Sequence, residues 1–241
     1  MIGIGTLINT AGIIAGGVLG AVFGKSLKER HRQSLCRVCG VSVLFVGISG
    51  ALEGMMKVEG GSLTAVHSML VVICLVLGSM LGELINIEGG FERFGNWLKI
   101  KSKSENDAGF LDAFLTATFT VCIGAMAVVG SIEDGVSGDW TVLGIKTVLD
   151  TIIIIAMTSS MGKGCIFSAI PVLLFQGLVT VLAVLIKPLF TELAISYLSM
   201  IGSVLIFCVG INLIWGKRIR VANMLPALIF AIAAAFLPID I

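Results

Sequence analysis

Lys146 and Asp150 are the two residues of this chain whose types and spacing best suit chemistry inside a membrane. They lie four residues apart in the apolar stretch VLGIKTVLDTIIIIAMTSSM, residues 142–161. In a helix this spacing places both side chains on one face, where the ammonium and the carboxylate partly neutralise each other. A charge near the centre of a bilayer costs from about 3 to more than 10 kcal/mol, so it usually faces a protein interior or a water-filled path. The pair therefore predicts an intramembrane site at which a carboxylate binds and releases a proton or a cation.

Neutral polar side chains in other apolar stretches are candidate partners for this pair. A single Asn or Gln in a membrane span most often forms a helix–helix hydrogen bond worth about 1 kcal/mol. Amides in three separate stretches, in a chain with a carboxylate in a fourth, favour a shared cavity near the membrane midplane. The candidate substrate- or ion-binding residues are Asp150, Lys146, Asn9, Gln176, Asn212 and Thr6.

The two charged residues differ in how firmly the sequence places them in the interior. Lys146 lies about one turn inside its stretch. Its four-carbon stem is therefore long enough to carry the ammonium to the membrane surface as an alternative. Asp150 is deeper and has a short side chain, which makes it the better candidate for an obligatory interior charge.

The composition is that of an integral membrane protein. Hydrophobic residues make up 57% of the 241 residues and charged residues 13%, and the mean hydropathy is +1.07. A soluble domain carries roughly 25% charged residues. The chain leaves no room for a separate soluble domain, so we predict one integral membrane domain over residues 1–241, in contact with membrane lipids.

Motifs of the common catalytic, cofactor and metal sites are not found in the sequence. There is no His-Glu-x-x-His, no Gly-x-Ser-x-Gly and no phosphate-binding loop. Cys36 and Cys39 form a single CRVC pair without the second pair or the histidines of a zinc site. No basic patch is large enough to neutralise several phosphates. We therefore expect no enzyme, no cofactor, no metal site and no nucleic-acid partner.

Eight apolar stretches are long enough to span a membrane, since about 20 residues cross the ~30 Å hydrocarbon core. They are residues 3–24, 38–54, 64–85, 110–131, 142–161, 165–186, 193–214 and 222–238. The turn at 161–164 is so short that the fifth and sixth stretches form a tight hairpin, or one of them re-enters without crossing. The sequence predicts an all-α bundle of seven or eight transmembrane helices.

The basic residues are distributed asymmetrically over this topology. Thirteen of the sixteen Lys and Arg residues fall on one side: Lys25, Lys28, Arg30, Arg32, Arg37, Arg93, Lys99, Lys101, Lys103, Lys163, Lys217, Arg218 and Arg220. The opposite side has only Lys57 and Lys187, and Lys146 is intramembrane. Cytoplasmic loops are enriched in Lys and Arg. The asymmetry predicts that the thirteen are cytoplasmic and that both termini lie outside.

Two segments of the chain partly repeat. GISGALEG (Gly47–Gly54) returns as VVGSIEDG (Val128–Gly135), and the segment 40–48 returns more loosely as 202–211. In the eight-span topology the first three and the last three spans are then an inverted pair, an arrangement typical of secondary transporters. The alternative is that such common residues match by chance.

Glycine spacing and one amphipathic loop add two expectations. Gly12, Gly16, Gly20 and Gly24 form a stripe on the first span, and small residues at this spacing let helices approach closely. This stripe suits packing within one bundle, which we favour, or contact between copies in a homo-oligomer. The segment Ile87–Lys101, IEGGFERFGNWLKIK, mixes charges with apolar residues at helical spacing and predicts an interfacial amphipathic helix.

Four segments match the pattern of a known family. They are IGTLIN (Ile4–Asn9) with the glycines that follow, GAMAVVGSIEDG (Gly124–Gly135), the Lys146–Asp150 pair and FQG (Phe175–Gly177). In these segments the chain resembles the bacterial YqgA/YdfK-type membrane proteins, over essentially its whole length. The resemblance implies a multi-pass protein of the bacterial inner membrane with a domain of unknown function, described at most as a transport protein. It supplies no catalytic or binding residues.

Taken together, these features favour a transporter or channel for a small solute or ion. Asp150 is the expected coupling or cation-binding carboxylate, Lys146 its partner, and the amides its neutral ligands. The alternative is a non-transporting membrane protein, a sensor or an assembly partner, whose polar residues only join helices. Convergence of the polar groups on one place distinguishes the two.

The charge asymmetry generates a direct test of orientation. A reporter that is active only in the cytoplasm, fused within residues 25–37 or 86–109, is expected to be active, because these loops hold nine of the basic residues. A matched fusion within residues 55–63 is the control and is expected to be silent. Reporter activity that places either basic loop outside the cell contradicts the predicted orientation.

Overall fold

The structure is a computed structural model, which describes residues 2–105, 107–123 and 125–237. Helices dominate the described chain, and one short β-hairpin interrupts them. The elements are α1 (Ile4–Ser26), α2 (Glu29–Met55), β1 (Met56–Glu59), β2 (Ser62–Ala65), α3 (Ser68–Ile85), α4 (Ile87–Lys101), α5 (Phe110–Cys122), α6 (Ala125–Ser137), α7 (Thr141–Met161), η1 (Lys163–Ser168), α8 (Ala169–Ile186), η2 (Lys187–Leu189), α9 (Glu192–Trp215), α10 (Val221–Met224) and α11 (Pro226–Ala234).

Six helical segments of the described chain are long and apolar enough to cross a membrane, and a bent pair of helices adds a seventh. The six are Ile4–Ser26, Gln33–Met55, Ser68–Ile85, Thr141–Met161, Lys163–Leu189 and Glu192–Trp215. Side chains such as Leu174, Val181 and Leu185 are 63%, 80% and 76% exposed, which suits a surface that faces lipid rather than water. The prediction of an all-α polytopic bundle is confirmed.

Three expected spans differ from the structure in detail. The stretch 110–131 is not one straight helix, because α5 and α6 meet at a bend of 60°. The third span begins at Ser68 rather than at residue 64, because residues 62–65 pair with β1 in an antiparallel hairpin. The last expected span, 222–238, contains the short apolar helices α10 and α11, and its residue 238 lies outside the described residues.

The hairpin before α3 has a local cause in its turn. Gly60 and Gly61 have φ values of 58° and 82°. Two successive residues with positive φ form the tight turn whose twist matches the flanking strands, and glycine adopts this backbone without steric strain. The turn brings Glu59 opposite Ser62, so the chain returns to the bundle before α3 begins.

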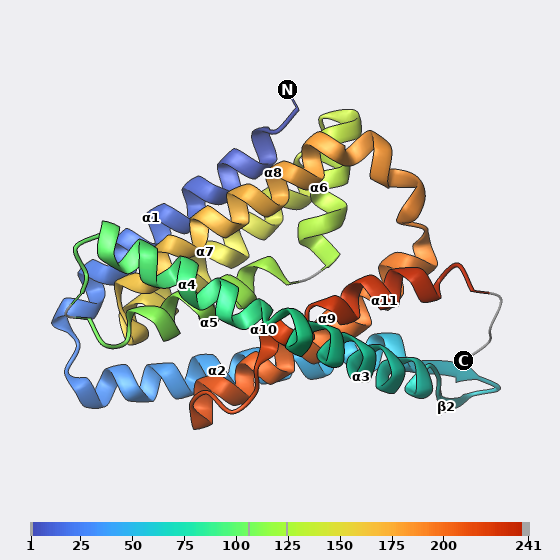
Figure 1. Ribbon diagram of the computed structural model, residues 1–241, viewed down its shortest axis with the longest axis horizontal. Coiled ribbons are helices and arrows are strands. Elements are labelled where there is room, and N and C mark those ends of the chain that lie inside the picture. Colours follow the sequence, from blue (N-terminus) through green and yellow to red (C-terminus); the bar gives the residue numbers. More distant parts are fainter. Residues whose placement is uncertain (1, 106, 124, 238–241) are drawn as a thin grey trace.

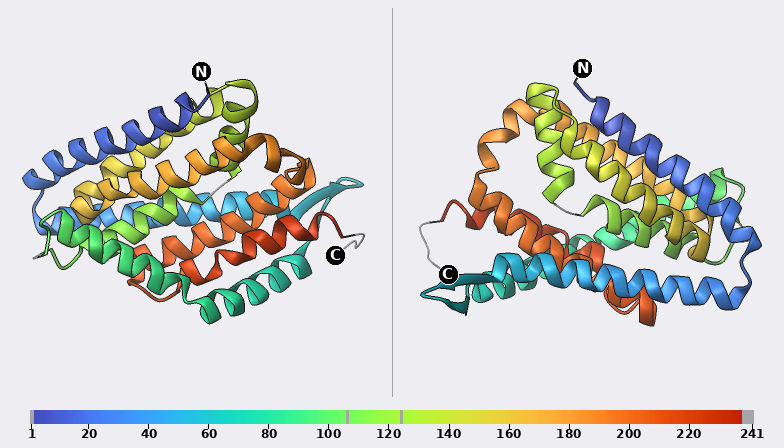
Figure 2. Two further views of the ribbon diagram at one scale, coloured as in Figure 1. Left: turned by 45° about the horizontal axis from the view of Figure 1, so that its top comes forward. Right: turned by 180° about the vertical axis from the view of Figure 1, so that it is seen from behind.

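The helices form two groups (Figure 1). Helices α1, α6, α7 and α8 gather on one side, α2, α3, α9 and α11 on the other, and α5 lies between them, as the two further views also show (Figure 2). Phe110 and Phe114 of α5 have no exposed surface, and both belong to a core cluster that also contains Ile13, Ile154 and Leu205. The short helix α5 is therefore the centre of the apolar core.

Glycines allow the closest helix contacts. The stripe of α1 faces α7, and a Cβ at Gly16 would lie 2.7 Å from the backbone oxygen of Thr151. In the second group, α2 crosses α9 so closely that a Cβ at Gly47 would lie 2.5 Å from the backbone nitrogen of Phe207. Backbones can approach this closely only where no side chain intervenes. The stripe of α1 is therefore used for packing within one chain, as favoured from the sequence.

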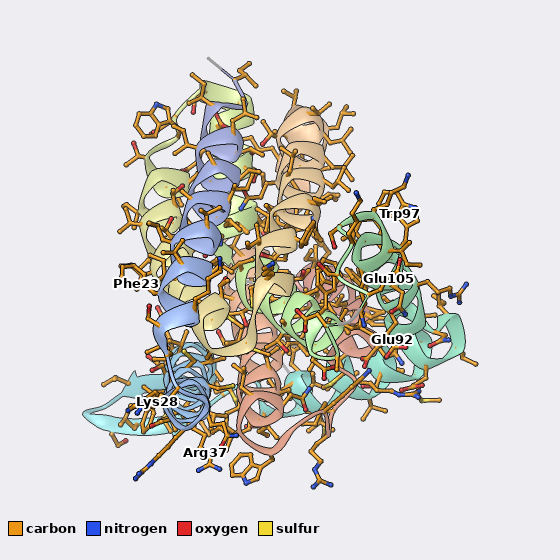
Figure 3. The ribbon with its side chains drawn as sticks, turned by 90° about the vertical axis from the view of Figure 1, so that its left-hand side faces the viewer. Phe23, Lys28, Arg37, Glu92, Trp97 and Glu105 are labelled. Carbon is orange, nitrogen blue, oxygen red and sulfur yellow. The ribbon has the colours of Figure 1, made fainter. Side chains whose placement is uncertain are left out.

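The amphipathic segment is helical with the predicted bounds, Ile87–Lys101. Its aromatic rings hold it against α5: Phe91 meets Phe119 edge-on at 5.3 Å between ring centroids, and Phe94 lies 6.0 Å from Phe114. Trp97 stacks on Phe94 with 5.9 Å between ring centroids and is 52% exposed. Figure 3 shows Trp97 at the outer edge of the molecule, and Lys28 and Arg37 extending from α2 and its connection. That α4 lies at a membrane surface stays a prediction.

The contact between α2 and α9 gives a stability prediction. Replacing Gly47 with Ala forces the two backbones apart and is expected to destabilise the protein by about 1–3 kcal/mol. The measurement is the melting temperature (Tm) of the purified protein in detergent. Gly177→Ala in α8 is the matched control, because a Cβ there meets nothing within 4 Å and Ala is the better helix former. Equal melting temperatures for Gly47→Ala and wild type would show that this contact does not limit stability.

Candidate functional site

The Lys146–Asp150 pair forms a buried ion pair on α7. The Nζ atom of Lys146 lies 2.5 Å from Oδ2 of Asp150, and the two residues are 7% and 4% exposed. Asp150 is the tenth of the 21 residues of α7, near its middle. The ammonium points toward the carboxylate and the bundle interior, so the alternative in which Lys146 reaches for a membrane surface does not describe this structure.

Two amides from other helices meet the carboxylate. Nδ2 of Asn9, on α1, donates to Oδ2 of Asp150 at 3.1 Å and to Oε1 of Gln176, on α8, at 3.3 Å. Both amide residues have no exposed surface. Three helices thus place four polar side chains in contact, and we call Lys146, Asp150, Asn9 and Gln176 the polar cluster.

The cluster joins the bent helix pair through Lys146. Its Nζ also donates to the backbone oxygen of Val121 at 2.8 Å. Val121 is in the last turn of α5, which ends at Cys122 because Ile123 adopts an extended backbone. The last carbonyls of a helix lack partners within the helix and carry partial negative charge. The ammonium therefore stabilises the end of α5 at the place where the span is interrupted.

The charge of Asp150 fixes the orientation of both amides. An ionised carboxylate only accepts hydrogen bonds, so Asn9 must direct its NH2 group at Asp150. That same NH2 group needs an acceptor on Gln176, which places Oε1 there and turns Nε2 away. Oδ1 of Asn9 and Nε2 of Gln176 are then left buried without a hydrogen-bond partner. The cluster thus presents one free acceptor and one free donor, the complement of a small polar group or a water molecule.

Thr6 and Asn212 lie outside this contact network. The Thr6 hydroxyl is 3.2 Å from that of Thr180 on α8, one turn away from Asn9 along α1. Asn212 instead binds the loop that follows α9: its Nδ2 donates to the oxygen of Ile219 at 2.7 Å, and its Oδ1 accepts from the backbone N–H of Arg218 and Ile219. The expectation that Asn212 joins Asn9 and Gln176 as a neutral ligand beside Asp150 is not met, because its hydrogen bonds instead shape a loop.

Asp134 has a structural task next to the cluster's helices. Its carboxylate, with no exposed surface, accepts from the backbone N–H groups of Gly3 at 3.1 Å and Gly5 at 3.0 Å. These are unpaired donors at the N-terminus of α1, where negative charge is stabilising. Within the VVGSIEDG segment, Asp134 therefore caps a helix that is far away in the sequence.

Sequence reasoning missed one group that contacts the polar cluster, the backbone oxygen of Val121, and one polar neighbour of the cluster, Thr180. Thr180 follows Gln176 by one helical turn, so the helical spacing of polar residues in α8 was a signal for it. The backbone oxygen of Val121 carries no such signal, because only the break in the helix makes it available. Beside the break lies an apolar cavity of about 350 Å³, whose walls include Cys122, Ile123 and Phe175.

Among the described residues, no group of three or more His, Cys, Asp or Glu side chains has the arrangement of a metal site. The polar cluster itself contains one carboxylate, one ammonium and two amides. The two atoms with which it could hydrogen-bond a further polar group are Oδ1 of Asn9 and Nε2 of Gln176.

Comparison with known proteins identifies the family. Residues 4–236 match the family described as "Protein of unknown function (DUF554)", and the chain belongs to it. It is 27% identical over 225 residues to "Uncharacterized membrane protein YdfK" of Bacillus subtilis (strain 168), covering 93% of this chain and 92% of that protein. It is 28% identical over 232 residues to "Uncharacterized protein YqgA" of Escherichia coli (strain K12), covering 95% and 94%. No solved structure matches. The resemblance noted from the sequence is confirmed, and the chain is a multi-pass membrane protein.

The ion pair generates a prediction about stability. Removing one partner leaves a buried charge unpaired, which costs about 3–5 kcal/mol. Asp150→Asn and Lys146→Met are therefore each expected to lower Tm in detergent more than the double change does. The matched control is the exposed pair of Arg220 and Glu83, 3.0 Å apart, where Glu83→Gln and Arg220→Met are expected to couple by no more than about 1 kcal/mol. Additive losses at residues 146 and 150 would mean that the two side chains do not stabilise each other.

Proposed function

We propose that this member of the family transports a small solute or ion across the membrane through the polar cluster. The observation that carries the proposal is the meeting of Asp150, Asn9 and Gln176 from three helices, with two of their polar atoms left without partners. Amides that only join helices satisfy each other. Here a donor and an acceptor remain available to a bound species.

Asp150 would bind the transported or coupled cation, with Lys146 as its internal counterion. Both Lys146 and Asn9 donate hydrogen bonds to the same oxygen of Asp150, Oδ2. A proton or Na⁺ that binds Asp150 neutralises the negative charge of its carboxylate. The carboxylate then attracts the ammonium of Lys146 less strongly. The hydrogen bond of Lys146 to the backbone oxygen of Val121 would remain available to the ammonium when it moves away from Asp150. Binding of the proton or Na⁺ would thus replace the Lys146 ammonium as the positive charge beside Asp150, in surroundings of low dielectric constant.

The bend between α5 and α6 supports a transport role. Interrupted helices expose backbone groups at membrane depth only where protein or a water-filled cavity surrounds them. In secondary transporters such half-helix ends bind ions and substrates near the midplane. In this chain the interrupted span ends at Cys122, and the oxygen of Val121 is already occupied by a charged group of the cluster.

The contacts of α2 and α9 support the inverted repeat. Gly47 and Gly210 are the second-last residues of the two similar segments 40–48 and 202–211. Gly47 packs on Phe207, three residues before Gly210, and Gly210 packs on Leu44, three residues before Gly47. When the two segments are aligned on these glycines, Leu44 corresponds to Phe207. Each glycine therefore contacts the same position of the other segment. Such reciprocity is expected of two repeats related by a two-fold axis, and we include inverted repeats in the proposal.

The proposed location is the bacterial inner membrane, with the basic loops in the cytoplasm and both termini outside. The asymmetric distribution of Lys and Arg supports this orientation. A small solute or ion would then pass between the outer face and the cytoplasm.

The competing function is a sensor or assembly partner that does not transport. The observation that favours it is the use of charged groups at helix ends, since Asp134 caps α1 and Lys146 occupies the end of α5. In that case the polar residues are needed for folding alone.

Ion flux in proteoliposomes separates these functions. With a potassium diffusion potential set by valinomycin, wild-type protein is expected to carry H⁺ or Na⁺ inward, followed with a trapped pH dye or with ²²Na⁺. Asp150→Asn should lower the flux at least tenfold, because the amide cannot neutralise a cation. Asp139→Asn, an exposed carboxylate beside the start of α7, is the matched control and should retain the flux.

Two results would contradict transport of these ions. One is a wild-type flux no larger than that of empty liposomes, which favours the non-transporting function. The other is equal flux from wild type and Asp150→Asn, which would remove Asp150 from the proposed site.

A further inference from the structure

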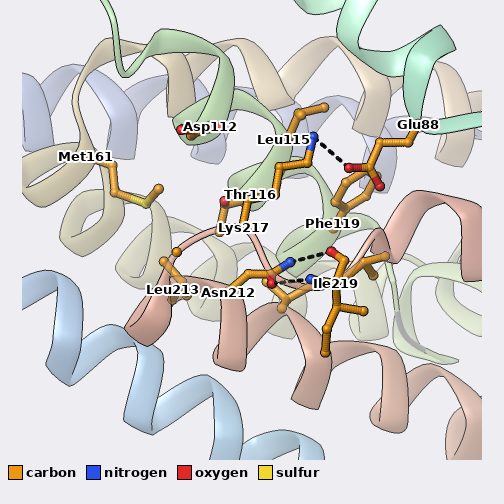
Figure 4. Close-up of a pocket in the computed structure, with 13 residues that line it drawn as sticks. Glu88, Asp112, Leu115, Thr116, Phe119, Met161, Asn212, Leu213, Lys217 and Ile219 are labelled. Atoms are coloured by element: carbon orange, nitrogen blue, oxygen red, sulfur yellow. Dashed lines mark hydrogen bonds and ion pairs between the residues drawn. The ribbon is translucent and has the colours of Figure 1, made fainter.

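A second cavity lies beside the loop that follows α9 (Figure 4). It has a volume of about 220 Å³ and is formed by α4, α5, the end of α9 and the loop that follows α9. Its walls are mostly apolar, with Leu115, Phe119 and Leu213 among them. Charged groups reach it at Glu88, Asp112 and Lys217. None of these residues belongs to the polar cluster.

Glu88 is the buried polar residue of this cavity. Its side chain is 6% exposed, and its Oε1 lies 2.8 Å from Nζ of Lys217. Its backbone N–H donates to Oδ1 of Asn223 at 2.8 Å, which fixes the start of α4. Oε2 is buried without a hydrogen-bond partner. An unpaired buried carboxylate oxygen is costly, so Oε2 indicates a missing hydrogen-bond donor.

The charges around the cavity favour a cation as that donor. Lys217 is the one ammonium that reaches the cavity from the described residues, and it is shared with a second carboxylate, Glu92. Although partial burial favours the neutral amine, the hydrogen bonds and charges of Glu88 and Glu92 raise the pKa of Lys217, so it stays protonated. Asp112 adds a further negative charge at the exposed rim. Carboxylates therefore outnumber the ammonium, and an anion would be repelled.

The walls favour an organic cation over a metal ion. Divalent metal ions are held by several oxygen ligands, and the described residues offer no group of three or more acidic, His or Cys side chains suited to one. The ring of Phe119 and the side chains of Leu115 and Leu213 instead suit a hydrocarbon body.

We propose that this cavity binds a small primary ammonium compound, whose NH3⁺ group donates to Oε2 of Glu88 and whose carbon chain lies against Phe119 and Leu213. A charge-assisted hydrogen bond between ammonium and carboxylate supplies the specificity. The proposal does not depend on transport through the polar cluster, because the two sites share no residue.

Binding of n-butylammonium to the full-length protein in detergent tests the site. Isothermal titration calorimetry and the rise in Tm are the readouts. Butan-1-ol is the matched ligand, since it has the same number of non-hydrogen atoms and a donor but no charge. We expect butylammonium to bind at least tenfold more tightly than butan-1-ol.

Variants then assign the interaction to Glu88. Glu88→Gln should weaken butylammonium binding at least tenfold, and Asp112→Asn, an exposed change that leaves the core intact, about threefold. Glu83→Gln is the control, because Glu83 also pairs with a cation, Arg220, but does not line the cavity. It should bind as wild type does.

Three outcomes would overturn the proposal. The first is equal binding of butylammonium and butan-1-ol to the wild type. The second is unchanged binding in Glu88→Gln. The third applies if Glu88→Gln does not fold: unchanged binding in Asp112→Asn then excludes the charge of the cavity as the cause of affinity.

Discussion

The constraint on which this structure depends is the satisfaction of buried polar groups without water. A bilayer interior offers no hydrogen-bond partners, so the ammonium of Lys146 must find all of its acceptors within the protein. It finds the carboxylate of Asp150 and the oxygen of Val121. The second of these exists only because α5 stops at Cys122. The interruption of the neighbouring span therefore serves the charge on α7: with a continuous helix the Val121 oxygen would be taken within the helix, and Asp150 would be the remaining acceptor of the two.

Close backbone contacts hold this arrangement in place. Gly12 and Gly16 bring α1 against α7, so that Asn9, one turn before Gly12, faces Asp150 at hydrogen-bond distance. Gln176 then arrives from α8 on the far side of Asn9. Since lipid supplies no hydrophobic effect between helices, van der Waals contact of small residues is the main source of this association. The glycine stripe and the polar cluster are thus successive parts of one face of α1.

The sequence predicted the parts of the fold that depend on periodicity and composition. The spans, the helix Ile87–Lys101 and the meeting of Asn9 and Gln176 with the ion pair follow from apolar length, amphipathic spacing and the scarcity of polar groups in lipid. The break after Cys122 did not, because the residues on both sides of it are as apolar as those of a straight helix. Asn212 was misplaced for a related reason: an amide at the end of a span binds a loop as readily as another helix, and sequence gives its depth but not its direction.

The cap that Asp134 places on α1 has a mechanical consequence for the bent pair. The carboxylate of Asp134 on α6 binds the start of α1, and the ammonium of Lys146 on α7 binds the end of α5. The backbones of α1 and α7 are in close contact, so both of these interactions connect the bent pair to the same two packed helices. The bent pair of α5 and α6 is therefore held on one side by the negative charge of Asp134 and on the other by the positive charge of Lys146. Neutralising Asp134 would loosen only the attachment of α6, and moving Lys146 away would loosen only that of α5.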